Sequence, residues 1–176
     1  MSQLKVNSIV PVGGLPSGAN GGIIQAVNVV KQDTFTSTTS GSFTDITGLS
    51  LSITPSSNSS KILVATCIYG HAEASSGSSV KVICGSTDIL ATSVGSRLAT
   101  NGAEAGDANE PGHCVNPLHN QTLLFSPGTT SAQTVKAQFF IQSGGGTFYI
   151  NRSETDNDNN GYIRTVSSIT AFEITA

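Results

Sequence analysis

The sequence predicts an all-β protein, an antiparallel β-sandwich of jelly-roll type that carries an extended N-terminal arm. Three observations favour this fold class. Ser and Thr make up about a quarter of the chain; β-branched Thr suits a half-exposed pleated surface and Ser suits turns. Short apolar segments recur at spacings of about 8–15 residues with turn residues between them. No segment of about 12 or more residues shows a helical 3.6-residue period between capping residues.

The chain is expected to divide into an arm and linker, residues 1–22, and a β-sandwich domain, residues 23–176. The apolar residues of the arm are Leu4, Val6, Ile9 and Val10. Residues 13–22 are rich in Gly, Ser and Asn, a composition typical of a flexible linker. A strand separated from its domain in this way lacks a local partner, so we expect the arm to add to a sheet edge of another protein. A frayed terminus is the alternative interpretation.

Each expected strand of the domain has its own pattern. Residues 23–30 are apolar and rich in β-formers, and residues 49–53 alternate strictly, so one face should be buried. Residues 61–69 are continuously apolar, which is typical of a strand buried on both faces. Residues 99–120 are expected to form a long polar loop. The remaining strands are expected at residues 43–46, 80–84, 122–125, 135–141 and 147–152, with one or two more between 162 and 174.

Composition argues against several classes of function. Charged residues are only 11% of the chain, the net charge is -3, and no basic cluster occurs, so nucleic-acid binding is not expected. No stretch approaches the ~18 apolar residues of a membrane helix, and residues 1–12 lack the pattern of a secretory signal. The cysteines Cys67, Cys84 and Cys114 are expected to be reduced thiols, because nothing suggests a disulfide framework.

Three stretches of the sequence carry a family resemblance. They are residues 2–9 at the start, 43–55 with 60–64 in the middle, and 149–153 with 168–174 at the end. With them the chain resembles a family of small phage structural proteins that is common among marine and cyanobacterial phages. The stretches cover less than half of the chain, in the expected order.

The resemblance implies a virion appendage or decoration, often trimeric, with a jelly-roll-like head similar to tumour-necrosis-factor and complement-type domains. We therefore expect a non-enzymatic virion protein, made in the host cytoplasm and placed on the tail or capsid surface, with no cofactor. Its partners would be other virion proteins, bound through Leu4, Val6, Ile9 and Val10, and further copies in a homotrimer. We expect adjacent strands to carry more large apolar residues than one inner face needs, so that some of them line the subunit interface: Phe139, Phe140, Phe148 and Tyr149.

Two segments of the sequence contain residues that could bind a metal ion. Asp156, Asp158 and Asn160, followed by Gly161, match the first half of a calcium loop, but the twelfth position is Ser167 where a Glu is needed. A hairpin tip explains the same residues, because Asx and Gly suit tight turns. Potential zinc ligands are His71, Cys67, His113, Cys114 and His119. Their spacing lacks the paired pattern of zinc sites, so we expect no bound metal.

No catalytic motif is evident. A G-x-S-x-G turn and a phosphate-binding loop are both absent, and the acidic residues lie mostly in expected loops. The main alternative is a carbohydrate-binding module that recognises a host-surface glycan. Its receptor-facing residues would be Asn101, Asp107, Asn109, Asn116 and His119. Residues 99–120 contain no Phe, Tyr or Trp to stack on a sugar, which argues against this alternative.

Overall fold

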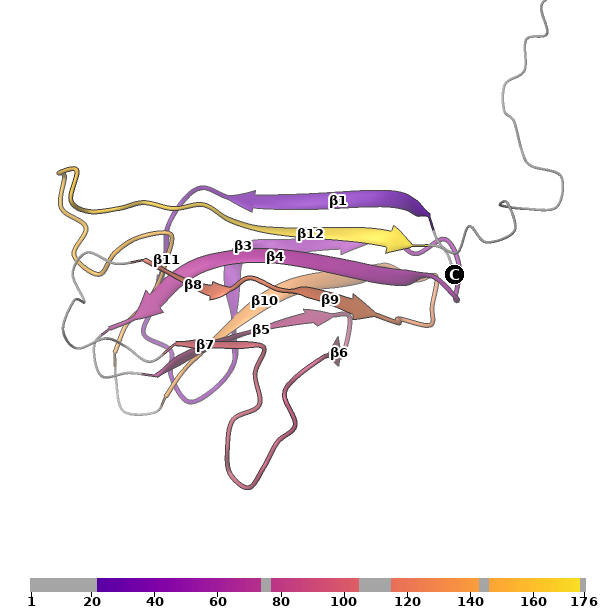
Figure 1. Cartoon of the computed structure of the whole chain (residues 1–176), viewed down its shortest axis with the longest axis horizontal. Helices are drawn as coiled ribbons and strands as arrows, with labels where there is room; N and C mark the ends of the chain where they lie inside the picture. Colours follow the sequence, from indigo (N-terminus) through magenta and orange to yellow (C-terminus); the bar gives the residue numbers. More distant parts are fainter. Residues whose placement is uncertain (1–21, 74–76, 105–114, 143–145, 175–176) are drawn as a thin grey trace, which may run out of the picture.

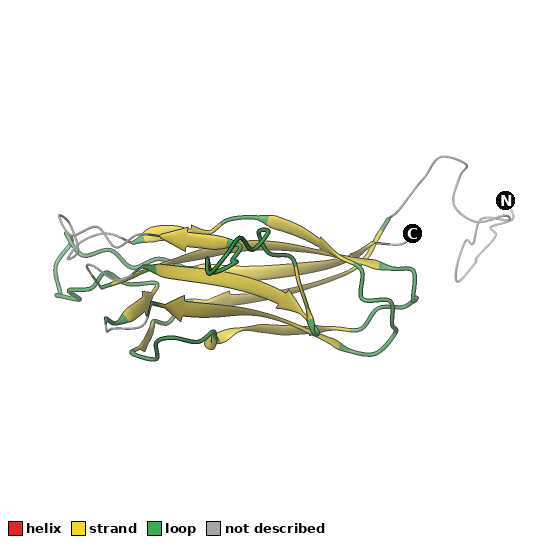
Figure 2. Cartoon of the chain, turned by 90° about the horizontal axis from the view of Figure 1, so that it is seen from below, coloured by secondary structure: helices red, strands yellow, loops and turns green. Residues whose placement is uncertain are grey.

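The computed structural model describes residues 22–73, 77–104, 115–142 and 146–174. Within these residues the structure is all-β, as the sequence predicts, and the long strands run along the long axis (Figure 2). The loop between β6 and β7 projects from one side of the domain (Figure 1). The arm residues Leu4, Val6, Ile9 and Val10 lie outside the described part of the chain.

The larger of two antiparallel sheets has seven strands. Their order is β1–β12–β4–β11–β2, and β8 and β9 also pair with β4. Figure 1 shows β1, β12 and β4 side by side. The bounds are β1 Ile23–Lys31, β12 Ser167–Ile174, β4 Lys61–Ala72, β11 Phe148–Ile150, β2 Phe35–Ser37, β8 Asn116–His119 and β9 Thr122–Phe125. Among the described strands, β1 therefore forms one edge of this sheet.

The smaller sheet has five strands in the order β3–β10–β5–β6, with β7 also paired to β5. The bounds are β3 Thr44–Ile53, β10 Gln133–Ile141, β5 Ser78–Cys84, β6 Thr87–Asp88 and β7 Gly102–Glu104. The two expected strands at 43–46 and 49–53 are one strand, β3. Gly48 adopts a φ of 87° where the β3–β10 register shifts, so the chain passes through a bulge without leaving the sheet.

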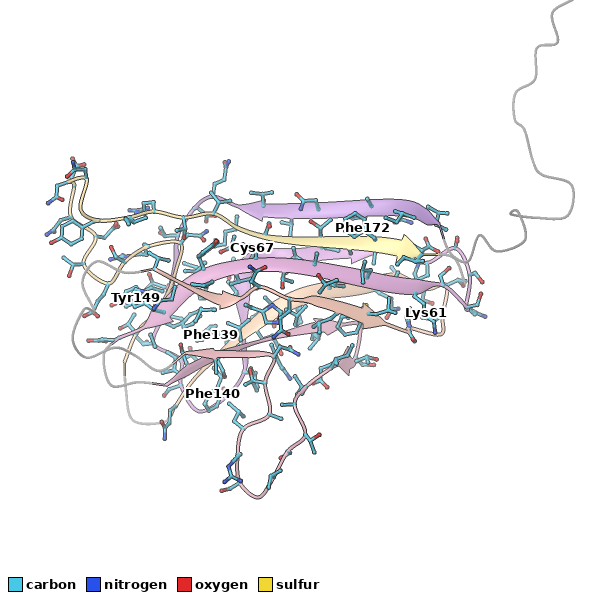
Figure 3. The ribbon with its side chains drawn as sticks, in the orientation of Figure 1. Lys61, Cys67, Phe139, Phe140, Tyr149 and Phe172 are labelled. Atoms are coloured by element: carbon cyan, nitrogen blue, oxygen red, sulfur yellow. The ribbon has the colours of Figure 1, made fainter. Side chains whose placement is uncertain are left out.

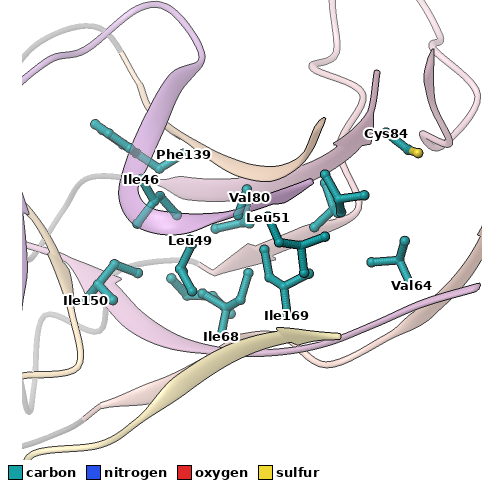
Figure 4. Close-up of a cluster of buried hydrophobic side chains, with 14 of the residues drawn as sticks. Ile46, Leu49, Leu51, Val64, Ile68, Val80, Cys84, Phe139, Ile150 and Ile169 are labelled. Atoms are coloured by element: carbon teal, nitrogen blue, oxygen red, sulfur yellow. The ribbon is translucent and has the colours of Figure 1, made fainter. Parts of the chain in front are cut away.

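The core lies between the two sheets. Alternate residues of the long strands point inward, so the smaller sheet supplies Phe139 and Leu49, and the larger sheet supplies Ile68 and Ile169 (Figure 4). All four side chains are fully buried. This arrangement is the sandwich of jelly-roll type that the sequence predicts.

Two expectations about the core are wrong. Phe139 and Phe148 do not lie in adjacent strands; they come from opposite sheets and stack across the core, with ring centroids 4.6 Å apart and planes at 8°. Both are fully buried, so neither can line a subunit interface. Phe140 points the other way and contacts Phe43 with centroids 5.5 Å apart, while Tyr149 stacks on His71 at 5.1 Å.

Residues 99–120 are not wholly a loop. They contain β7 and β8, which pair with β5 and β4. Neither strand was predicted, because each is short and polar, and the same is true of β2 and β6. Pairing with neighbouring strands of the sheet forms these short strands, because their own residues show no alternation of apolar and polar side chains.

Candidate interaction surface

The most distinctive surface is the outward side of the larger sheet, where directly paired residues form rows across the strands. One row is Ala26, Phe172, Leu63 and Leu124, from β1, β12, β4 and β9. The next row is Asn28, Thr170, Ala65 and Thr122. A third, shorter row is Val30, Ser168 and Cys67. We call these three rows the outer face; Figure 3 labels Phe172 and Cys67 on it, with Lys61 at one end of β4.

The outer face carries no ionisable carboxylate, ammonium or guanidinium group within its three rows. Leu124 and Val30 are each 50% exposed, and Leu63 and Phe172 are half-buried by their neighbours in the sheet. The polar members pair with each other: the Asn28 amide donates to the Thr170 hydroxyl at 2.7 Å. An uncharged, largely apolar sheet face of this kind is characteristic of the centre of a protein–protein interface.

The continuous apolar pattern of residues 61–69 predicts a strand that is buried on both faces. The structure shows that this prediction is wrong for β4. Its even-numbered residues from Ile62 to Ile68 point into the core and are buried, whereas its odd-numbered residues from Lys61 to Tyr69 are only half-buried on the outer face. The continuous apolar pattern is nevertheless real. The chain itself covers one side of β4 and leaves the other side to solvent.

The edge of the sheet beside the outer face is also apolar. Ile23 and Ile24 are 62% and 51% exposed, and the register is shifted between Ile23 and Gln25. The first charged residue of β1 is Lys31, its last. Long apolar edge strands are sites where a further strand can pair, unless charge or a covering segment prevents it.

The predicted receptor-facing residues do not form one surface. His119 lies in β8 and is only 2% exposed; its Nδ1 lies 2.5 Å from the Thr66 hydroxyl. Asn101 accepts a hydrogen bond from the Val82 amide at 2.8 Å and donates to the Ile89 carbonyl, so its amide holds the loop after β6. Asn116 is part of β8, and Asp107 and Asn109 lie outside the described residues.

The pKa values of the two buried histidines, His71 and His119, are lowered. Burial lowers the pKa of His119 to about 4. Burial, together with the nearby Arg152 guanidinium, also lowers the pKa of His71. Both imidazoles are therefore neutral near pH 7, which suits packing against Thr66 and Tyr149. The other proposed zinc ligands, His113 and Cys114, lie outside the described residues.

The Asp/Asn loop is organised by ion pairs and turns. The two carboxylate oxygens of Asp156 accept hydrogen bonds from the Nε and Nη2 atoms of Arg164 at 2.8 and 2.5 Å, and Arg152 Nη1 lies 3.8 Å away. Asn159 accepts from the Gly161 amide at 2.8 Å, as in an Asx turn. Asp158 and Asn160 are exposed. A cation would have to displace Arg164 from Asp156, and in the described part of the chain no group of three His, Cys, Asp or Glu comes together.

A second surface feature is an open hollow of about 570 Å³ beside β5 and β10. Its lining includes Phe140, Leu98, Ser79 and Gln142. Sequence reasoning missed it because Phe140 lies 20 residues or more from the loop residues that complete the hollow. Among the described residues there is no helix long and apolar enough to span a membrane.

Comparison with known proteins gave no sequence match. No protein-family profile matches the chain, and no curated protein matches it. Among solved structures, the chain is similar to the VP2 protein in the crystal structure of the infectious bursal disease virus subviral particle. The TM-score is 0.39 at 12% identity, over 94% of this chain and 44% of VP2. The chain thus spans under half the length of VP2, and a likeness at this level carries no conclusion about function.

Proposed function

We propose that the chain is a non-enzymatic structural protein of a phage virion, a trimeric tail-fibre or appendage component that its N-terminal arm anchors to another virion protein. One observation carries the proposal. The arm enters the domain at Ile23, the first residue of β1, which is an edge strand with exposed Ile24 and Val30. An edge strand is where a strand of another protein can pair, and the exposed apolar side chains of β1 can contact that partner.

The sequence supports the same function independently. The stretches that resemble phage structural proteins, residues 2–9, 43–55 with 60–64, and 149–153 with 168–174, include the start of the arm and most of β12. A domain with few charges and an uncharged outer face is also suited to assembly with other subunits. Decoration of the capsid is the alternative location on the particle, and a cryo-electron microscopy map of the parent particle distinguishes it from the tail.

The anchoring role is tested by changing only the apolar side of the arm. Leu4, Val6 and Ile9 are replaced together by Ser, and incorporation into particles is measured by mass spectrometry of purified virions. We expect incorporation to fall at least about tenfold, because strand addition loses its side-chain pockets. The matched control replaces Gln3, Lys5 and Asn7 by Ser and should incorporate normally. Normal incorporation of the apolar triple variant contradicts anchoring by the arm.

Recognition of a host-surface glycan is a second candidate function, and the hollow beside Phe140 favours it. Phe140 is partly exposed there, next to the Ser79 and Gln142 side chains. An aromatic ring beside hydroxyl and amide groups suits the apolar and polar sides of a sugar. Glycan-array binding that disappears with Phe140→Ala supports this function. Absence of binding by the wild-type domain argues against it.

A further inference from the structure

We infer that the N-terminal arm, at residues 4–10, pairs with strand β1 of its own domain before it binds another virion protein. The inference rests on the proposed function, in which this arm is the anchor, and it names the site that holds the arm before assembly. The starting point is the position of β1. It is an edge of the larger sheet among the described strands, and the linker leads directly into it. Native proteins often cover such an edge with a further segment of the chain.

The free side of β1 is apolar and only partly covered. Val27 and Val29 pack against the core but stay half-buried, and Ile23 and Ile24 are exposed. On this side of the sandwich β1 packs against β3, which is the edge strand of the smaller sheet among the described strands. A further strand beside β1 therefore covers Val27 and Val29 where the sandwich is open.

The arm matches β1 residue by residue in one antiparallel register. The pairs of apolar residues in this register are Leu4 with Val29, Val6 with Val27, Ile9 with Ile24, and Val10 with Ile23. All four apolar residues of the segment 4–10 thus face apolar residues of β1, and directly opposite side chains in antiparallel strands are in contact. A shift by one residue in either direction places Leu4 or Val6 opposite Asn28 and turns the arm's side chains to the other face of the sheet.

The irregularities of the two segments also coincide. In β1 the alternation of apolar and polar residues ends at residues 23–24, where the register with β12 shifts. In the arm the alternation ends at residues 9–10, which lie opposite residues 23–24 in the same register. The charged Lys5 then lies opposite Asn28, which is exposed on the outer face. The arm therefore fits β1 in its apolar residues, its polar residues and its break in pattern.

The linker favours the chain's own β1 over that of another copy. In the inferred register residues 11–22 form the connecting loop, and their composition is rich in Gly. Neighbouring strands lie about 5 Å apart, whereas 12 residues can span about 40 Å, so the loop closes without strain. A short flexible linker gives an effective concentration of about 1 mM, which another copy reaches only at that protein concentration. A virion partner then takes the arm by strand exchange.

The first test is a disulfide across the inferred pair Asn7 and Ala26. Directly opposite residues have Cβ atoms about 5 Å apart, which a disulfide can bridge with little movement. The control joins Asn7 to Val30, which is exposed on the same side of β1 four residues further along. Asn7→Cys is therefore combined with Ala26→Cys in one variant and with Val30→Cys in the other. We expect the first variant to form a disulfide within one chain at least about tenfold faster than the control.

The conditions make the disulfide specific. Both variants are full-length and carry Cys67→Ala and Cys114→Ser, so that the only other thiol is that of Cys84, which is 2% exposed. Oxidation by diamide is followed at nanomolar protein concentration on a non-reducing gel, where disulfides within one chain and between two chains migrate differently. Equal melting temperatures of the reduced variants confirm that both fold.

The second test needs no added cysteine. Hydrogen exchange of the β1 amides is measured by mass spectrometry in the wild type, in the apolar triple variant of the arm and in its matched control. We expect exchange in β1 to be at least about fivefold faster in the apolar triple variant, because the arm no longer protects the edge. The matched control should exchange like the wild type. Equal exchange in all three proteins overturns the inference.

The outcomes of the disulfide test separate this inference from the proposed function. A disulfide that forms mainly between two chains, or no faster than in the control, overturns pairing of the arm with its own β1, even if the apolar triple variant is lost from virions. A rapid disulfide within one chain supports the pairing even if the apolar triple variant is incorporated normally, in which case anchoring by the arm fails alone.

Discussion

The Asn151 side chain accepts a hydrogen bond from the Ser167 hydroxyl at 2.6 Å, which joins the residue after β11 to the first residue of β12. The Ser167 oxygen accepts in turn from the Tyr69 amide of β4 at 3.0 Å. The Asn151 amide group donates to the carbonyl oxygens of Lys31 and Asp33 at 2.8 and 3.0 Å. One fully buried side chain therefore connects segments near one end of four strands of the larger sheet.

Removing the Asn151 side chain should lower the free energy of unfolding. Asn151→Ala removes the acceptor of the Ser167 hydroxyl and the donor to the Lys31 and Asp33 carbonyl groups, and it places Ala at a φ of 61°, which Asn tolerates better. We expect a loss of about 3 kcal/mol in the free energy of unfolding, measured by urea denaturation. Asn157→Ala, at an exposed loop position, is the control and should change stability by less than about 0.5 kcal/mol. A loss below about 1 kcal/mol for Asn151→Ala would show that Asn151 does not organise this region.

The stacked pair across the core gives a second prediction. Phe148→Ala removes a fully buried ring that stacks on Phe139, so we expect a loss of about 3–5 kcal/mol in the free energy of unfolding. Phe140→Ala removes the same number of atoms from a partly exposed ring and should cost less than half as much. Equal losses in thermal or urea unfolding would place Phe140 and Phe148 in equivalent surroundings, contrary to the structure.

Acid should destabilise the fold through His119. Its pKa falls from an ordinary 6.5 to about 4 on folding because it is buried, so below pH 6.5 the unfolded chain takes up a proton that the folded chain excludes. This contribution to stability is intact above pH 6.5 and declines as the pH falls toward 4. Between pH 7 and 4.5 it amounts to about 2–3 kcal/mol.

The check is to compare the wild type with His119→Gln, which cannot take up a proton. Urea denaturation at pH 7 and pH 4.5 gives the loss for each protein, and we expect the loss to be about 2–3 kcal/mol smaller in the variant. Thr66→Val serves as a control, because it removes the hydroxyl partner of His119 and leaves the titrating group in place. Identical pH dependence in wild type and His119→Gln would refute the assignment.

A close backbone approach makes Gly70 a sensitive position. A Cβ atom there would collide with the Tyr149 carbonyl oxygen on β11 and would come within 2.9 Å of Ile150 Cδ1. Gly70→Ala should therefore push β11 away from β4 and lower the free energy of unfolding by about 1–3 kcal/mol. Gly22→Ala, where nothing lies within 4 Å, should have little effect. An unchanged free energy of unfolding in the Gly70→Ala variant would mean that β11 can move away from β4 without destabilising the fold.

The long strands could be predicted because their own residues carry the pattern. The alternation of Val135, Ala137, Phe139 and Ile141 predicts β10 and its buried face, and each of these side chains is fully buried. The short strands β2, β6, β7 and β8 could not be predicted, because their pairing depends on neighbours that are distant in the sequence. His119 shows the consequence: it was placed in a polar loop, but pairing of β8 with β4 buries it.

The sequence by itself determined the all-β class and the inward-facing residues of segments 49–53 and 135–141, because a two-residue period is a local property of the chain. Only the tertiary structure decided which strands become neighbours. That choice brings Phe139 to Phe148 across the core, gathers distant segments around Asn151, and aligns Ala26, Phe172, Leu63 and Leu124 in one outward row. The continuous apolar pattern of β4 predicted that both of its sides are buried. Within one chain only one side is buried, because the smaller sheet packs on only one face of the larger sheet.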